Sequence, residues 1–478
     1  MDAKLLVAAE EGTDDGADYA SASDATTPLG QTASASDATT PLGQTVKDEE
    51  ATAGIFGTSM NVVVQVMGIG ITSLSFMLKQ GGWSCLVLMI GCAVAANYSG
   101  KLLIACCYDE GGVRVNESYG DIGFAAFGKC GRFTTRLFEN ITFFGISALF
   151  LILAGDFLSE LPVEMNPRIW TLASAAIVCV PVLLFPNIAE LRFVSVIGVA
   201  AVIVVAFAVL FLAGLANNND DSGGGHAGNT TTFANSGGMM TSSRWSHSTD
   251  VIIPLGFLSS FSSMTLAFGC HAGLPAVEQS MKNPKRFGTM FNIAFAIVLS
   301  LYIPVAIVGY AKYGDEVQSP ILLSLPSGSW VQVLAKGMLC THVLLAYPIL
   351  MMFFVREIEH WLNVNRAASS TVTRYVLKRT GIRVISIVLN VTVAILAPYF
   401  SDMMGLIGAL GSVMTTFVLP CLFFLKLKTM SGSSSQKCGA WILPLCVGVV
   451  GTIGGAVGAL EATISLVQKI AARGNPWQ

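Results

Sequence analysis

Charged residues are scarce in this chain. Only 12% of its 478 residues are Asp, Glu, Lys or Arg, whereas about 25% is usual in a soluble domain. Hydrophobic residues make up 53%, and the mean hydropathy is +0.65. An ordinary soluble protein is therefore excluded. Lys and Arg form no basic block with interleaved aromatic residues, so nucleic acid is excluded as a partner.

Chemically reactive clusters are also missing from the sequence. The 11 cysteines have no paired spacing typical of a zinc site or a disulfide framework. The apolar stretches lack the grouped His, Asp and Glu side chains that hydrolysis or metal chemistry requires. No repeated loop resembles a channel filter. We therefore expect no enzyme activity, no metal and no cofactor.

Long apolar segments are what the chain has in abundance. About 20 apolar residues cross the roughly 30 Å hydrocarbon core as a helix. Eleven segments of about that length lie near residues 54–78, 84–107, 136–159, 169–187, 192–215, 251–279, 288–313, 329–356, 381–400, 402–425 and 440–468. The sequence therefore predicts an all-α membrane protein with about 11 transmembrane helices, embedded in a lipid bilayer.

The remaining segments are polar. Residues 1–53 are predicted to be a disordered tail that contains a 13-residue direct repeat, ASASDATTPLGQT. Residues 54–468 form the transmembrane domain, and 469–478 a short tail. Lys and Arg collect in alternate connections, which places the N-terminus in the cytoplasm and the loop 216–250 outside it. Asn229 in that loop begins a glycosylation sequon, although a chance match is equally compatible.

Two of the apolar segments are broken by glycine, the first at Gly68 and Gly70 and the sixth between Gly269 and Pro275. Such breaks free backbone groups that hydrocarbon cannot satisfy. Breaks at matching positions of two halves are typical of secondary transporters, and five spans per half make the repeat inverted. The predicted substrate-binding residues are Gly68, Ile69, Gly70, Ile71, Gly269, Cys270, His271 and Ala272.

His271 is the candidate for coupling to protons, because an ionisable group at bilayer depth usually faces a polar cavity. A neutral histidine bonded to a nearby carbonyl is the alternative, and the glycines of the first break also suit close helix packing. His342 has no adjacent break, so a structural role is favoured there. Glu278 lies near a span end, where a charged group at the membrane surface or contacts with a loop explain it.

Around these breaks the sequence resembles the amino acid/auxin permease family, part of the amino acid–polyamine–organocation superfamily. The resemblance rests on Gly68-Ile69-Gly70-Ile71, on Gly81-Gly82-Trp83, on Ser118-Tyr119-Gly120-Asp121 and above all on residues 270–284, CHAGLPAVEQSMKNP. This last motif is most similar to vesicular inhibitory and neutral amino acid transporters. The resemblance implies a 5+5 inverted repeat plus an eleventh helix, in which the broken helices bind the α-amino and α-carboxyl groups.

The resemblance also implies cation coupling in many members. Val64 and Ala346 stand where sodium-coupled relatives have Asn and Thr, and aliphatic side chains cannot ligate a hard cation. We therefore expect an amino acid transporter that works by alternating access, coupled to H+ or uncoupled, in a plasma, vacuolar or vesicular membrane. A membrane-embedded amino acid sensor without net transport is the alternative, because it needs the same pocket.

Overall fold

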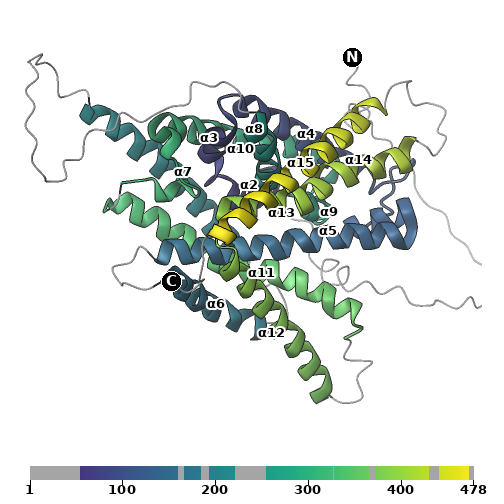
Figure 1. The fold of residues 1–478 in the computed structure, drawn as a ribbon. Helices are drawn as coiled ribbons and strands as arrows, with labels where there is room; N and C mark the ends of the chain where they lie inside the picture. Colours follow the sequence, from purple (N-terminus) through teal and green to yellow (C-terminus); the bar gives the residue numbers. More distant parts are fainter. Residues whose placement is uncertain are drawn as a thin grey trace, which may run out of the picture.

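The structure is a computed structural model that describes residues 54–159, 166–184, 193–220, 254–326, 328–364, 372–429 and 441–472. The predicted tail 1–53, Asn229 with most of its loop, and residues 473–478 lie outside these ranges. Most of the described residues are helical, and these residues contain no β-strand (Figure 1). The all-α prediction is therefore confirmed.

Each of the eleven predicted segments coincides with one helix or with a series of helices. The helices are α2 (Ile55–Gly70), α3 (Leu74–Gly81), α4 (Cys85–Ala105), α5 (Tyr119–Leu158), α6 (Pro167–Leu184), α7 (Phe193–Asp220), α8 (Pro254–Ala267), α9 (Leu274–Gln279), α10 (Phe287–Tyr313), α11 (Trp330–Trp361), α12 (Val372–Leu396), α13 (Phe400–Ile407), α14 (Leu419–Phe424) and α15 (Ile442–Ala472).

The described residues contain seven helical stretches that are long and apolar enough to cross a membrane. Three shorter apolar helices lie at Ile55–Gly68, Arg168–Leu183 and Ile197–Leu212. Helices of this length and composition are those of a multi-pass membrane protein. The total of eleven crossings and the inverted repeat remain predictions.

The third long helix begins earlier than the sequence suggested. Ser118 and Asp121 form a reciprocal capping box at the start of α5. The helix then breaks at Phe127 and Gly128, where Gly128 has a φ of 63° that favours glycine. The chain is helical again after Gly128 and continues to Leu158, so the helix begins several residues before the segment predicted from residue 136.

Both broken segments lie in the interior of the bundle. Helices α2 and α3 pack against α10, and α3 also packs against α8 (Figure 1). On its other sides α8 contacts α13 and α15, while α11 packs against α5 and α7. The first and sixth apolar segments are therefore neighbours, with α10 beside the first and α13 beside the sixth.

Candidate functional site

The first break lies just after Gly70. Helix α2 is continuous through Gly70, and residues 71–73 form a turn before α3 starts at Leu74. The N–H of Ile321 donates to the carbonyl oxygen of Thr72 at 2.7 Å. Gly68 and Gly70 therefore belong to the last turn of a helix, and the unwound residues follow them. Ile71 is fully buried in that turn.

The second break has the location that the sequence predicted. Helix α8 ends at Ala267, a single 3₁₀ turn covers His271–Gly273, and α9 starts at Leu274. Among the described residues, the N–H groups of Cys270, His271 and Ala272 meet no acceptor. This break therefore presents several backbone donors close together.

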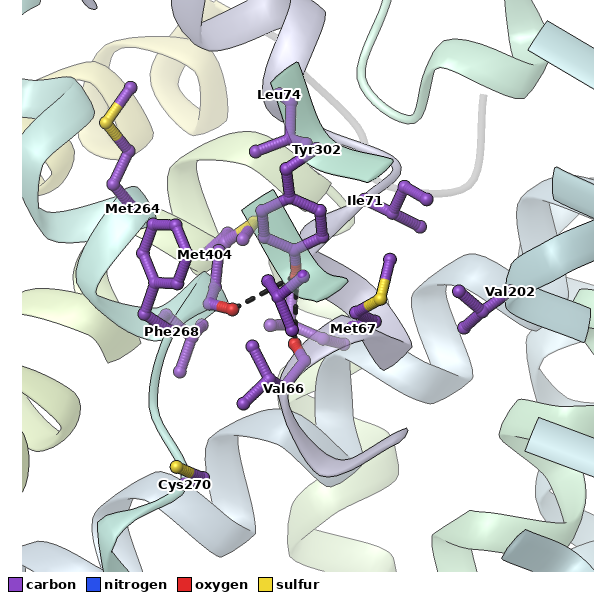
Figure 2. Close-up of a cluster of buried hydrophobic side chains, with 14 of the residues drawn as sticks. Val66, Met67, Ile71, Leu74, Val202, Met264, Phe268, Cys270, Tyr302 and Met404 are labelled. Carbon is purple, nitrogen blue, oxygen red and sulfur yellow. Dashed lines mark hydrogen bonds between the residues drawn. The ribbon is translucent and has the colours of Figure 1, made fainter. Parts of the chain in front are cut away.

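The hydroxyl of Tyr302 on α10 joins the two breaks. Its Oη lies 3.0 Å from the carbonyl oxygen of Val66 and 3.1 Å from that of Ala267 (Figure 2). Ala267 is the last residue of α8, where carbonyl groups lack intrahelical partners. Val66 lies one turn before the end of α2. Tyr302 is fully buried. One side chain thus fixes both helix ends at the same point.

Gly70 allows this close approach. A methyl group added there would lie 2.3 Å from Oη of Tyr302 and 2.8 Å from Cβ of Ala267. The side-chain face of Gly70 is therefore filled by protein. This geometry matches the helix-packing alternative considered from the sequence. Its assignment to substrate binding remains a prediction, as does that of Ile69, whose side chain lies outside the described part.

His271 is buried, with 1% of its surface exposed, and points to helix α4. Its Nε2 lies 3.0 Å from Oγ of Ser99, while its Nδ1 has no partner among the described residues. The histidine is thus anchored on one side by a hydroxyl, where the sequence analysis considered a carbonyl. Its role in coupling remains a prediction.

One face of the second break is accessible. Gly269, Ala272 and Gly273 are partly exposed, whereas Cys270 is buried. Across from them, the exposed Gln65 of α2 has its Oε1 3.0 Å from where a methyl group on Gly273 would lie. The amide of Gln65 therefore lies close against the glycine of the second break, where a larger residue would be crowded.

The end of α9 is held by a charged cluster that the sequence analysis missed. The carboxylate of Glu278, which is fully buried, accepts from the Tyr108 hydroxyl and the Arg114 guanidinium. Arg114 also donates to the carbonyl of Pro275 at 3.1 Å, and Lys428 donates to that of Tyr108 at 2.6 Å. Glu278 is thus held by the connection between α4 and α5, which matches the loop contact that the sequence allowed rather than a position at the membrane surface.

A polar cavity of about 310 Å³ opens beside α3, and none of the predicted site residues lines it. Its charged lining residues are Lys79, Asp156, Glu316, Asp402 and Lys469. They come from separate parts of the chain, so no local pattern could predict the cavity. Among the described residues, no group of three His, Cys, Asp or Glu side chains is arranged to hold a metal.

Comparison with known proteins identifies the class. The profile of the family described as transmembrane amino acid transporter protein matches residues 51–462, so the chain belongs to that family. It is 28% identical to amino acid transporter AVT1I of Arabidopsis thaliana, over 84% of this chain and 94% of that one. It is 24% identical to the vesicular GABA transporter of Caenorhabditis elegans, over 79% and 73% of the two chains.

A manganese transporter of Eremococcus coleocola shares 14% identity at a TM-score of 0.49, covering 89% of this chain and 96% of that one. The family membership confirms the resemblance found in the sequence. The chain is accordingly a multi-pass membrane protein of an amino acid transporter family, not an enzyme.

Proposed function

We propose that the chain is a secondary active transporter that moves an amino acid by alternating access and binds its head group between the two breaks. The observation that carries this proposal is the meeting of both breaks at the Tyr302 hydroxyl. Unwound backbone in the interior of a membrane protein needs polar partners. A small zwitterion supplies both the donors and the acceptors that such backbone lacks.

The polarity of the helix ends suggests how the zwitterion lies. Helix α2 ends at Gly70, and the carbonyl groups at a helix C-terminus favour a positive charge. The free N–H groups of Cys270, His271 and Ala272 favour a carboxylate. We therefore place the amino group beside the end of α2 and the carboxylate at the second break. From the sequence alone we expect the opposite orientation, with the carboxylate at Gly68, Ile69 and Gly70 and the amino group at the second break. We reverse it because Gly68 and Gly70 remain helical.

Coupling to H+, or no coupling, follows from the chemistry of the side chains. Ala346 on α11 offers no oxygen to a sodium ion. His271 is a titratable group inside the second break, which makes it the candidate proton carrier. We further propose a cytoplasmic N-terminus, as the distribution of Lys and Arg predicts.

Uptake by proteoliposomes tests this proposal. The purified chain is reconstituted, and accumulation of each radiolabelled proteinogenic amino acid and of 4-aminobutyrate is measured with and without a pH gradient and with and without sodium. Accumulation that does not depend on sodium is expected for at least one solute. Binding without accumulation would favour the sensor, and strict dependence on sodium would contradict the proposed coupling.

A further inference from the structure

A second buried histidine lies at the first break. His342 on α11 has 4% of its surface exposed. A methyl group added at Gly68 would lie 3.5 Å from its Nε2, so the imidazole faces the last turn of α2 with no side chain between them. No local pattern predicts this contact, because His342 and Gly68 belong to apolar segments far apart in the chain.

One ring nitrogen of His342 lacks a hydrogen bond. Its Nδ1 is buried and has no partner in the part of the chain that the structure describes. Its aromatic neighbour is Phe150 of α5, which meets it edge to face at a centroid distance of 6.4 Å. Buried polar groups in proteins are nearly always hydrogen-bonded. A histidine retained only for packing would be expected to have a partner, as His271 has in Ser99.

We propose that His342 completes the substrate site, with its Nε2 accepting a hydrogen bond from the amino group of the bound amino acid. This inference rests on the function proposed above. The carbonyl end of α2 favours a positive charge at this point, and the neutral imidazole offers an acceptor there. Glycine at position 68 fits this role, because it places no side chain between the His342 imidazole and the solute.

Ligand binding to the purified full-length chain tests the role of His342. Each proteinogenic amino acid and 4-aminobutyrate is screened for an increase in Tm, and the Kd of the most stabilising compound is measured for each variant. His342→Leu should weaken binding roughly tenfold, the loss expected for one hydrogen bond. His342→Gln retains a hydrogen-bond acceptor, so its Kd should lie between those of the wild type and His342→Leu. Thr341→Ala, on the exposed side of the same helix, should bind like the wild type.

A double-mutant cycle separates contact with the ligand from a packing role. Gly68→Ala places a methyl group in ordinary contact with the imidazole, so the protein should fold while the ring is shielded from the ligand. We expect Gly68→Ala to weaken binding in the wild type and to have little further effect in His342→Leu. If the two substitutions acted through independent structural effects, their changes in binding free energy would add in the double variant.

The outcomes distinguish this inference from the proposed function. A folded His342→Leu variant with the Kd of the wild type overturns the role of His342, while uptake by the wild type would still support transport. If His342→Leu does not fold, an unchanged Kd in His342→Gln has the same meaning. Wild-type binding without accumulation in proteoliposomes overturns transport alone. No stabilising amino acid at all overturns both.

Discussion

The two broken segments are interrupted alike, but different chemistry holds their second halves. Around α3 the contacts are hydrogen bonds to carbonyl groups. Oγ of Ser75 donates to the carbonyl of Val305 at 3.0 Å, and Nζ of Lys79 donates to that of Val317 at 3.3 Å. Around α9 the main contact is the ion pair of Glu278 with Arg114. A hydrogen bond contributes about 0.5–3 kcal/mol, whereas separating a buried ion pair costs about 3–5 kcal/mol because it leaves a charge unpaired. We therefore expect α9 to be held in place more firmly than α3.

The largest effect should come from filling the contact between the two segments. Gly70→Val places carbon atoms against the Tyr302 hydroxyl and Ala267, where even a first methyl group has no room. Overpacking a close contact costs about 1–3 kcal/mol or more. We expect a strong loss of folded protein, measured by size-exclusion chromatography in detergent.

Gly91→Ala is the matched control for this substitution. Gly91 is a helical glycine on α4 with no atom within 4 Å of an added methyl group. Its replacement should leave the yield of folded protein unchanged or slightly increased, because alanine favours helix more than glycine does. An equal yield from Gly70→Val and Gly91→Ala would show that the breaks are not closely packed.

Neutralising the charged cluster should have the next largest effect. Glu278→Gln leaves the Arg114 guanidinium beside a neutral amide, and hydrogen bonds to charged groups contribute on the order of 1.5–3 kcal/mol. We expect a lower Tm for Glu278→Gln. Glu110→Gln, at an exposed position of the nearby loop, is the control and should leave the Tm unchanged. Equal Tm values for both variants would argue that the ion pair does not hold α9.

Removing the bridge between the segments should have a smaller effect. Tyr302→Phe loses one neutral hydroxyl, which corresponds to about 1 kcal/mol of unfolding free energy. The same change removes the atom nearest to a methyl group at Gly70. Gly70→Ala should therefore lower the Tm less in Tyr302→Phe than in the wild type. Strictly additive changes in Tm would show that Gly70 and Tyr302 do not meet.

The sequence predicted the breaks because glycine and proline act locally. The predicted position of the first break is slightly too early. A glycine in a helix lowers the stability of that helix by only about 1 kcal/mol relative to alanine, and tertiary packing easily offsets this loss. Tyr302 and Ala267 provide such packing at Gly70. The second break contains a proline and three nearby backbone donors, and its position was predicted well.

The anchoring side chains could not be predicted in the same way. Glu278 and Arg114 are 164 residues apart, and Glu278 alone looks like a charge at the end of a membrane span. The contact of His342 with Gly68 likewise becomes visible only in the folded structure, where α11 lies beside α2. Contacts of this kind depend on how helices that are distant in the sequence pack together. Neither the periodicity nor the composition of the sequence predicts that packing.

The smallest expected effect is the change in Tm with pH that Tyr108 of the charged cluster produces. Burial raises the pKa of Tyr108, although the nearby Arg114 opposes the shift. A phenol with a raised pKa contributes fully below the ordinary value of about 10, and its contribution is lost only as pH rises through the higher folded value. Tyr108→Phe should thus lower the Tm by a similar amount at every pH between about 6 and 9.

A difference in Tm that faded between about pH 7 and 9 would mean that Tyr108 ionises in that range. A phenolate cannot donate a hydrogen bond to Glu278 and would repel its carboxylate. The cluster at α9 would then weaken with rising pH. A constant difference would instead leave the ion pair of Glu278 and Arg114 as the main contact that holds α9.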